Sequence, residues 1–387
     1  MPDTYSPREM IERLIAFDTT SAGSNLELIA FVEDYLAGHG VASRRSSGEA
    51  KKANLFATVG PEVEGGVVLS GHTDVVPVAN QAWVTDPFQV VEQDGKLYGR
   101  GTSDMKSFLA IALALVPRML EAGIRVPLHL ALSYDEEVGC LGVRSMIADI
   151  ETALPAPRAV LVGEPTSMKL VNAHKGINAF VTRVTGKEAH SSQTHRSASA
   201  IMAAARLIGH LEQVAAEKRE NGPFDERFEP PHTTVSVGTF EGGTALNIVP
   251  RHAHFVWEYR LLPGDDGAAI EAGFRALAED HVLPSLRATA PEADIVTETI
   301  SAVPPLRPES DSPAEDLVRH LSGTNLTDAV SFGTEGGLFQ DAGFSTVVCG
   351  PGSIDQAHQP NEFIELSQVA ACEDFLRKLI DWAANPA

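Results

Sequence analysis

Cysteine is scarce in this sequence, and the three that occur stand far apart in 387 residues: Cys140, Cys349 and Cys372. An odd and widely spaced set forms neither a disulfide framework nor the paired thiolates of a structural zinc site, so a reducing compartment fits best. Long apolar runs are also missing. No stretch approaches the roughly 18 apolar residues that a membrane span requires, and the opening MPDTYSPREM contains no apolar signal core. We therefore expect a cytoplasmic protein without a membrane partner.

Basic residues are outnumbered, because 30 Lys and Arg stand against 52 Asp and Glu and give a formal net charge of −22. Such a charge repels phosphate backbones, and no cluster of Lys and Arg offsets it, so we expect no nucleic-acid partner. Hydrophobic residues make up 43% of the chain and charged residues 21%, which is ordinary for a soluble globular protein. The length exceeds what one core usually serves and predicts two domains, or one domain with an insertion.

Two helix signals open the chain, and short apolar runs follow them. Ser6-Pro7-Arg8-Glu9 has the form of a capping box with proline at the first helical position. Ser24 and Glu27 repeat the capping signal before a second helix, which Gly38 and Gly40 end. Strand-like runs come next, the last three of them separated by helical stretches: NLFATVG, GVVLSG, LHLALSY and AVLVGEP. This order predicts an α/β fold whose mixed sheet is largely parallel and carries helices on its faces.

The middle of the chain has a different pattern. Strands with alternating polarity, INAFVTRVTG, TTVSVGTF and HAHFVWEYRL, are interleaved with two helical stretches. The order strand, helix, strand, strand, helix, strand is typical of a ferredoxin-like α+β unit, and the proline-rich ISAVPPLRPESDSP closes it. We therefore predict a discontinuous α/β domain, residues 1–174 and 302–387, into which residues 175–301 are inserted as a second domain.

Polar side chains gather where the predicted strands end. Each apolar run of the first domain is followed by histidine or by acids, and the glycine-rich turn YGRGTSDMKS places another acid at the start of a helix. Because ligands bind beyond the carboxyl ends of the strands in open α/β sheets, we expect these side chains to share one site. The set is His72, Asp74, Asp104, Glu136, Glu137, Glu164 and His358.

Imidazoles and carboxylates without a cysteine are the donor set of a catalytic metal site. Two histidines and three carboxylates suit a pair of divalent ions about 3.5–4 Å apart that share one carboxylate. Asp74, two positions after His72 in extended chain, is placed to hold the tautomer of that imidazole. Helix capping is the alternative for Asp104, but capping does not explain the adjacent acids Glu136 and Glu137, whose repulsion a cation would offset.

Five segments, GHTDVVP, YGRGTSDMKS, SYDEEVG, GEPT and QAHQPNE, resemble in order and spacing the metal-site segments of the dinuclear zinc deacylases and exopeptidases. The resemblance spans essentially the whole chain. It implies a zinc-dependent amidohydrolase whose catalytic domain is the α/β domain and holds two divalent ions, Zn²⁺ or Co²⁺. It also implies that the inserted domain is a lid and carries the contact of a homodimer.

The resemblance assigns the metal ligands one by one. His72 and Glu164 would bind one ion, His358 and Glu137 would bind the other, and Asp104 would bridge the two. The peptide bond that follows the bridging aspartate is expected to be cis.

For catalysis, the resemblance implies that Glu136 is the general base, which takes a proton from the attacking water and returns it to the departing amine. Asp74 completes the catalytic set in the α/β domain. In the inserted domain, His190 in GKEAHSSQ matches an oxyanion-stabilising histidine that is often donated across a dimer. Asn247 and Arg260 match lid residues, and a bidentate arginine suits the α-carboxylate of an acylamino acid.

The segments around Glu164 and His358 are most similar to those of the acetylornithine deacetylase branch of the family. This likeness implies hydrolysis of N2-acetyl-L-ornithine to L-ornithine and acetate, a step of arginine biosynthesis. Glu335 in GTEGG would then pair with the substrate's ammonium group. A desuccinylase-like or aminoacylase-like deacylase, or a dipeptidase or carboxypeptidase, stays open as the alternative, because pocket shape sets specificity on a shared scaffold.

Other classes of protein fit less well. No G-x-S-x-G elbow supports a nucleophilic hydrolase, and YGRGTSD lacks the third glycine of the dinucleotide-binding fingerprint. A metal-containing sensor that had lost catalysis would have replaced its base, whereas Glu136 is present.

Overall fold

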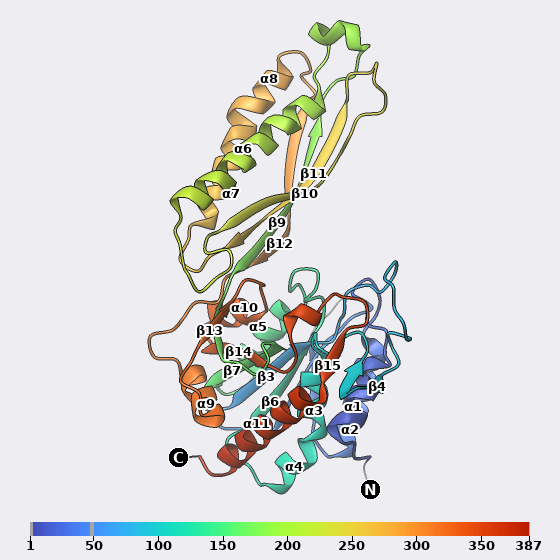
Figure 1. The fold of residues 1–387 in the computed structure, drawn as a ribbon. Helices are drawn as coiled ribbons and strands as arrows, with labels where there is room; N and C mark the ends of the chain where they lie inside the picture. Colours follow the sequence, from blue (N-terminus) through green and yellow to red (C-terminus); the bar gives the residue numbers. More distant parts are fainter. Residues whose placement is uncertain (1–2, 47–49, 387) are drawn as a thin grey trace. The chain divides into compact units, whose positions relative to one another are not determined.

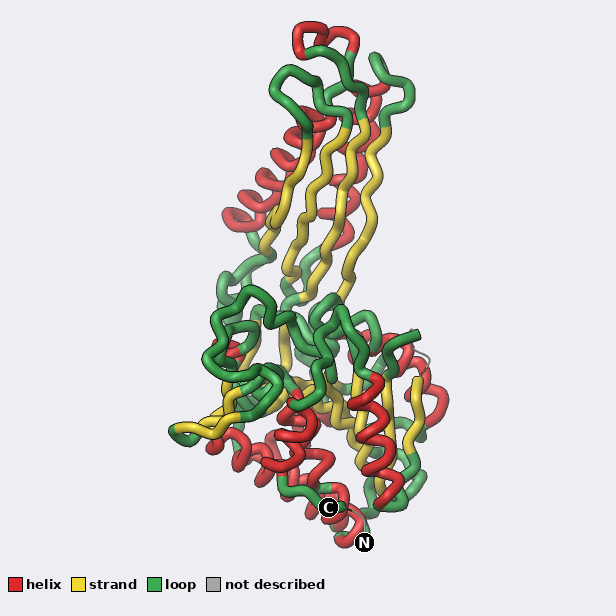
Figure 2. The backbone as a smooth tube through the Cα atoms, turned by 90° about the vertical axis from the view of Figure 1, so that its right-hand side faces the viewer, coloured by secondary structure: helices red, strands yellow, loops and turns green. Residues whose placement is uncertain are grey.

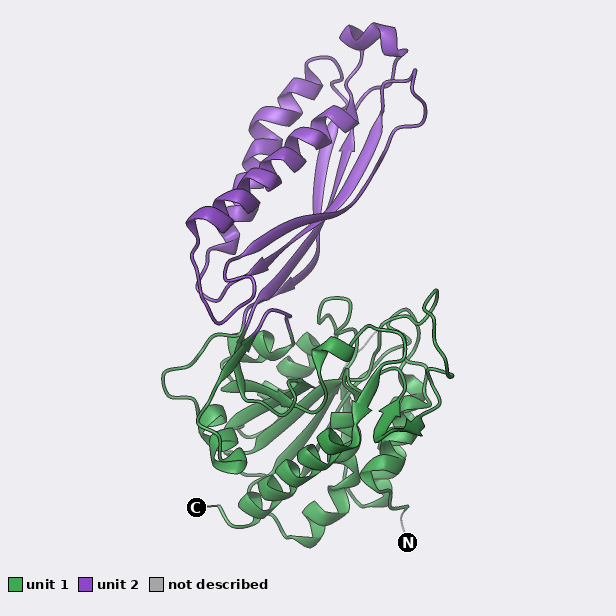
Figure 3. Ribbon diagram, in the orientation of Figure 1, with its two compact units in different colours: residues 1–173, 306–329, 334–387 green, residues 174–305, 330–333 purple. Residues whose placement is uncertain are grey.

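The computed structural model describes residues 3–46 and 50–386, and these form two compact units (Figure 3). Unit 1 comprises residues 1–173, 306–329 and 334–387, and unit 2 comprises residues 174–305 and 330–333. The predicted insertion, residues 175–301, lies within unit 2. In the part of the chain that is described, no helix combines the length and the apolar character of a membrane span.

Unit 1 is built on a large mixed sheet (Figure 1). Its strands, as far as the chain is described, follow the order β1 (Ser43–Ser46), β2 (Asn54–Val59), β6 (Leu128–Ser133), β3 (Val67–His72), β7 (Ala159–Pro165), β14 (Thr346–Gly350), β8 (Val171–His174) and β13 (Asp328–Val330). The four central strands, β6, β3, β7 and β14, run parallel, whereas β1, β2 and β8 pair in the antiparallel sense. Leu69 of β3 pairs with Leu130 of β6 and with Leu161 of β7, which sets the register at the centre.

Helices cover both faces of this sheet. The helices α1 to α4, α9 and α11 share one apolar cluster with Leu69, Leu130 and Leu161, while α5 and α10 contact the strands from the opposite face. A small sheet orders β15 (Phe363–Glu365), β5 (Lys96–Tyr98) and β4 (Val91–Gln93). The helices are α1 (Pro7–Ile15), α2 (Leu26–Gly38), α3 (Lys106–Ala114), α4 (Val116–Glu121), α5 (Val143–Ala153), α9 (Pro313–Ser322), α10 (Gly336–Asp341) and α11 (Leu366–Ala384), with a short η3 (Ile354–Gln356).

Unit 2 is an antiparallel sheet with helices on one face (Figures 1 and 2). The sheet order is β10 (Thr234–Gly242), β11 (His252–Leu261), β9 (Gly176–Thr185) and β12 (Asp294–Val303). The helical segments are η1 (Ser191–Arg196), α6 (Ala200–Asn221), α7 (Gly267–Ala276), η2 (Leu277–Val282) and α8 (Leu283–Arg287). Trp257 stacks on Phe180 at 4.4 Å and lies 4.5 Å from Phe274, so unit 2 has an aromatic core of its own.

The predicted fold class is confirmed, because a largely parallel mixed sheet and a separate sheet in βαββαβ order are both present. The capping box at Ser6 is also confirmed: the Ser6 hydroxyl accepts from the Glu9 main chain, and the Glu9 carboxylate accepts from the Ser6 main chain. The second capping box is wrong. The N-cap of α2 is Asn25, not Ser24. The Ser24 hydroxyl accepts the main-chain N–H of Leu26 at 3.2 Å and donates to the carbonyl of Lys51 at 2.6 Å, so it contacts the start of the helix from one position further out.

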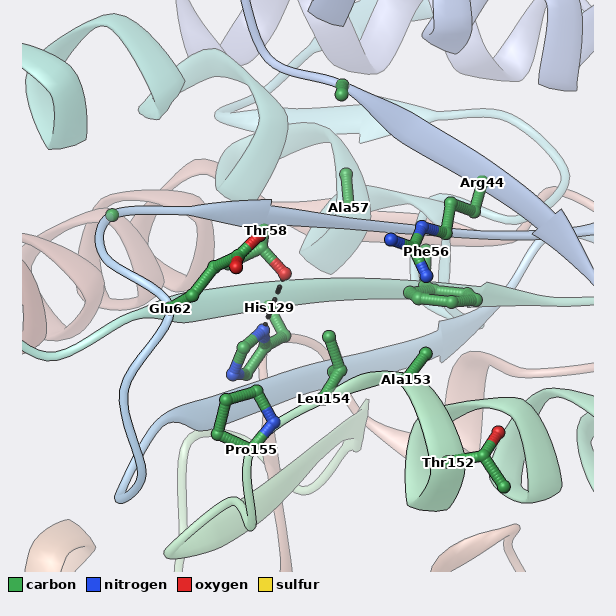
Figure 4. Close-up of a pocket in the computed structure, with 12 residues that line it drawn as sticks. Arg44, Phe56, Ala57, Thr58, Glu62, His129, Thr152, Ala153, Leu154 and Pro155 are labelled. Atoms are coloured by element: carbon green, nitrogen blue, oxygen red, sulfur yellow. Dashed lines mark hydrogen bonds between the residues drawn. The ribbon is translucent and has the colours of Figure 1, made fainter.

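One buried histidine of unit 1 lies outside the predicted site. His129 on β6 is 1% exposed, and its Nδ1 lies 2.9 Å from the hydroxyl of Thr58 in a pocket of about 510 Å³ (Figure 4). Burial lowers the pKa of His129 to about 4. The ring is therefore neutral in the folded protein, whereas an unfolded chain protonates it below about pH 6.5.

Stability should rise with pH between about 4 and about 6.5, because the unfolded chain binds more protons there, and the full change from His129 is at most about 3 kcal/mol. His129→Asn keeps a partner for Thr58 but does not titrate. Urea unfolding at a series of pH values should therefore give a smaller slope for the variant across this window. Parallel curves for the two proteins would contradict a neutral His129 in the fold.

Candidate metal centre

Asp104 lies between two imidazoles at the carboxyl edge of the large sheet. Its Oδ1 is 3.1 Å from Nε2 of His72, and its Oδ2 is 3.3 Å from Nε2 of His358. His72 is the last residue of β3, Asp104 precedes α3, and His358 lies in the loop after β14. Three segments that are distant in the sequence thus place one carboxylate against two nitrogen donors.

Two glutamates lie on either side of this arrangement. Oε1 of Glu164, near the end of β7, is 3.4 Å from Nε2 of His72, and Oε2 of Glu137, after β6, is 3.0 Å from Nε2 of His358. Candidate ligand atoms form two groups, and within each group all the atoms lie within 4.8 Å of one another. One group is His72, Asp104 and Glu137, and the other is His72, Glu136 and Glu164. The structure therefore brings together the five residues predicted as metal ligands and the predicted base.

Glycines allow close packing behind this cluster. A Cβ atom at Gly71 would lie 2.3 Å from Cε of Met105, and one at Gly163 would lie 2.1 Å from the ring of Phe108. A larger residue at Gly163 would have to displace the Phe108 ring of α3, and one at Gly71 would have to displace the side chain of Met105. The peptide between Asp104 and Met105 is cis, as the family resemblance implied.

Burial and mutual repulsion shift the titration of the cluster. Burial first, and neighbouring carboxylates next, raise the pKa of Glu136 and Glu137 above the usual range and that of Glu164 to about 8. Hydrogen bonds from both imidazoles outweigh burial at Asp104 and hold its pKa below the usual range. Contacts with Asp104 and Glu137 raise the pKa of His358 to about 10. Acids crowded in this way attract a multivalent cation.

Asp74 supports the site differently from the prediction. Nδ1 of His72 donates to the main-chain carbonyl of Asp74 at 2.8 Å and lies 3.6 Å from the carboxylate, so the nearer carbonyl sets the tautomer. The carboxylate instead accepts the main-chain N–H groups of Glu136 and Glu137, at 3.1 and 3.3 Å, and the hydroxyl of Ser21 at 2.8 Å. Asp74 thus fixes the turn that presents the two acids, while Nε2 of His72 faces the carboxylates of Asp104 and Glu164.

Glu335, predicted as a substrate contact, lies behind the cluster. This residue is fully buried, and its two carboxylate oxygens accept the hydroxyls of Ser70 on β3 and Ser133 on β6, the latter at 2.8 Å. Burial raises its pKa above the usual value. Neither oxygen is exposed or unpaired, so Glu335 would have to give up a serine hydroxyl to bind a substrate's ammonium group. It joins the ends of two strands behind the cluster.

Glu362 is a buried acid that the sequence analysis missed. Its carboxylate accepts the main-chain N–H groups of Gly101, Ser103 and Asp104 at 2.7–3.1 Å and the guanidinium of Arg100 at 2.6 Å. It therefore fixes the turn that presents Asp104. The one available signal was an acid four positions after a histidine at a predicted strand end, in QAHQPNE. That local pattern does not predict which groups Glu362 contacts.

The remaining predicted residues belong to unit 2. His190 is exposed, and its Nδ1 accepts the main-chain N–H of Ser192 at 3.2 Å, which leaves the ring proton of the neutral imidazole on Nε2. Asn247 is exposed, and its carbonyl accepts from Ser191. Arg260 is partly exposed on β11 and makes two contacts with Glu258, at 3.1 and 3.2 Å.

Comparison with known proteins identifies the family of the chain. Residues 68–382 match the description of peptidase family M20/M25/M40. The chain belongs to this family. A curated relative, the acetylornithine deacetylase of Myxococcus xanthus, is 36% identical over 391 positions, which cover 98% of each chain. As an M20 member, the protein is a hydrolase.

Solved M20 structures share the fold. An M20 metallo-carboxypeptidase from Sulfolobus solfataricus has a TM-score of 0.76 at 17% identity, with 98% of this chain and all of that chain covered. A dinuclear metal-binding M20 peptidase from Bacillus subtilis has a TM-score of 0.65 at 14% identity, with 98% of both chains covered.

Replacing Glu362 tests how the turn of this M20 chain is held. Glu362→Gln leaves the buried guanidinium of Arg100 opposite a neutral amide and removes one acceptor of main-chain N–H groups. We expect a lower melting temperature and, roughly, at least tenfold weaker Zn²⁺ binding, measured by calorimetry and by competition with a chromogenic chelator. Glu365→Gln makes the same charge change at an exposed position nearby and is the matched control. Equal stability and Zn²⁺ affinity of the two variants would refute this role.

Proposed function

We propose that this M20 hydrolase cleaves the amide bond of an N-acyl amino acid, with N2-acetyl-L-ornithine as substrate and L-ornithine and acetate as products. One observation carries the reaction class: the two oxygens of Asp104 face different imidazoles, with Glu136 in the same cluster. A carboxylate shared in this way suits a pair of metal ions, and a further acid beside it suits proton transfer to and from water.

The donor set fits two divalent ions, for which we propose Zn²⁺, with Co²⁺ as a substitute. His72 and Glu164 would hold one ion, His358 and Glu137 the other, and Asp104 both. The buried Oε1 of Glu164 supports this, because it lies 3.4 Å from Nε2 of His72 but accepts no hydrogen bond from the described residues. When bound, such ions supply Lewis acidity that favours ionisation of water and polarises the acyl carbonyl. The solved relative from Bacillus subtilis, described as a dinuclear metal-binding peptidase, also supports a pair of ions.

Glu136 supplies the proton transfers in this proposal. Its main-chain N–H is held by the carboxylate of Asp74, so the side chain starts from a fixed point of the turn. The carboxylate takes a proton from the water as its oxygen bonds to the acyl carbon. The same proton then passes to the amide nitrogen, the C–N bond breaks, and the amine and the carboxylate product leave.

Residues of unit 2 serve substrate binding in this proposal. His190 keeps its ring proton on Nε2, as the contact with Ser192 requires, and this N–H would donate to the developing oxyanion. Arg260 would bind the substrate's α-carboxylate in exchange for its present partner Glu258. Asn247, whose main-chain carbonyl accepts from Ser191, would add a polar contact beside His190.

The substrate is proposed from the relatives. The Myxococcus xanthus relative is an acetylornithine deacetylase and is similar over nearly its full length. A peptidase activity is the second candidate, because the Sulfolobus solfataricus neighbour is a metallo-carboxypeptidase.

A substrate panel separates these candidates. We expect the metal-loaded enzyme to hydrolyse N-acetyl-ornithine with kcat/KM at least roughly tenfold above that for acetyl-citrulline, acetyl-methionine, succinyl-diaminopimelate or a dipeptide, since a matched pocket discriminates by about that factor or more. Amine release is the measurement. Preference for the dipeptide would support the second candidate, and any other preference would remove ornithine while leaving the reaction class.

Glu136→Gln tests the base. The amide cannot accept the proton, so kcat should fall by about 10²–10⁴-fold, while the metal content measured by atomic emission stays unchanged. Glu121→Gln, at the exposed end of α4, is the matched control. Turnover by Glu136→Gln at the rate of the control would show that another group moves the proton.

Metal removal tests the cofactor. Dialysis against a strong chelator should abolish hydrolysis, and Zn²⁺ or Co²⁺ should restore it, with saturation near two equivalents per chain by titration. Undiminished hydrolysis after exhaustive chelation would rule out the proposed chemistry.

A further inference from the structure

Cys140 is a buried cysteine whose sulfur contacts the proposed base. Its Sγ lies 3.3 Å from Oε1 of Glu136, and the residue is 1% exposed. Among the described residues, this thiol is the one hydrogen-bond donor to the Glu136 carboxylate. Cys140 belongs to neither of the groups of clustered ligand atoms, so it is not placed as a metal ligand.

The turn after Glu136 is shaped so that the sulfur points back to it. The main-chain N–H of Cys140 donates to the carbonyl of Glu136 at 2.9 Å, which closes one turn of chain. Gly139 and Cys140 both have positive φ, at 114° and 53°. A positive φ is costly for cysteine, because its Cβ crowds the main chain there. Glycine would fit this backbone at lower cost.

The start of the same turn is anchored independently. Asp135 is buried and accepts two hydrogen bonds from Nζ of Lys52, at 2.6 and 2.7 Å. The next two main-chain N–H groups are held by Asp74. With the main chain fixed at both ends, the orientation of the Glu136 carboxylate depends on its side-chain torsions and on its one donor.

We propose that Cys140 is a positioning residue for catalysis: its S–H group holds Oε1 of Glu136 and so directs the other oxygen toward the attacking water. The inference rests on the proposed role of Glu136 as base. Burial raises the pKa of the Cys140 thiol well above its usual value, so the sulfur keeps the proton that it donates. A thiol is a weak donor, which orients the carboxylate while leaving it able to accept a proton.

Kinetics of three variants test the proposal, on whichever substrate of the panel the wild type cleaves best. Cys140→Ala removes the donor, and kcat should fall by roughly three- to tenfold with KM changed less than about twofold, as expected for one weak hydrogen bond. Cys140→Ser keeps a donor and should stay within about threefold of the wild-type kcat. Cys372→Ala, at another buried free cysteine, is the matched control and should leave kcat unchanged.

Infrared spectroscopy of the metal-free protein gives a readout that does not depend on activity. The difference spectrum between wild type and Cys140→Ala isolates the S–H stretching band of Cys140. Glu136→Leu removes the acceptor, so this band should move to higher frequency and become narrower. The bands of Cys349 and Cys372 should not move.

The outcomes separate this inference from the proposed function. The role of Cys140 would be overturned by any of three results. These are an unchanged kcat in Cys140→Ala, a loss of kcat in Cys140→Ser equal to that in Cys140→Ala, or an S–H band that does not move in Glu136→Leu. If Cys140→Ala does not fold, the serine variant and the infrared comparison in Glu136→Leu decide. Full activity of Glu136→Gln would instead overturn the proposed base, whereas a different preferred substrate affects neither result.

Discussion

Repulsion between closely spaced carboxylates is the constraint on which the rest of unit 1 depends. Glu136, Glu137, Glu164 and Asp104 converge from three different segments, and burial strengthens the interaction between their charges. A fold tolerates such a cluster only if cations or donors offset it, and two imidazoles alone do so incompletely, as the raised pKa values of the glutamates indicate. A pair of divalent ions would offset it, and for this reason the cluster is the feature from which the function is proposed.

A second set of buried acids holds the cluster in place. Asp74 binds the main chain of the turn that carries Glu136, Glu362 binds the turn that carries Asp104, and Glu335 joins two strand ends through serine hydroxyls. Hydrogen bonds to charged groups contribute about 1.5–3 kcal/mol each, so these contacts stabilise the ligand geometry before any ion binds. Asp74 and Glu362 bind main-chain N–H groups, so the positions of these turns do not depend on which side chains serve as metal ligands.

Unit 2 carries its own core, and this separates its tasks from those of the metal centre. The stacked Phe180 and Trp257 and the neighbouring Phe274 are buried independently of the large sheet. His190 is exposed and Arg260 partly exposed on this unit, and both are proposed to contact the substrate.

The sequence by itself determined the elements and the chemical types of the site. Period-two and helical patterns predicted both sheets, and His72, Asp104, Glu137, Glu164 and His358 were recognisable because each lies at a strand end or helix start in a short motif. The Ser6 capping box was predictable for the same reason: all its partners lie within four residues.

Only the tertiary structure decided what each acid contacts. The Ser24 hydroxyl donates to Lys51, and Glu335 is buried against Ser70 and Ser133. Glu362 pairs with Arg100, which lies more than two hundred and fifty positions away in the sequence. Hydrogen bonds depend on distance and angle in space, and the sequence separation of two polar groups carries no information about either. Local patterns therefore identify the donors and acceptors, while the packing of the sheets and helices determines which of them form hydrogen bonds with each other.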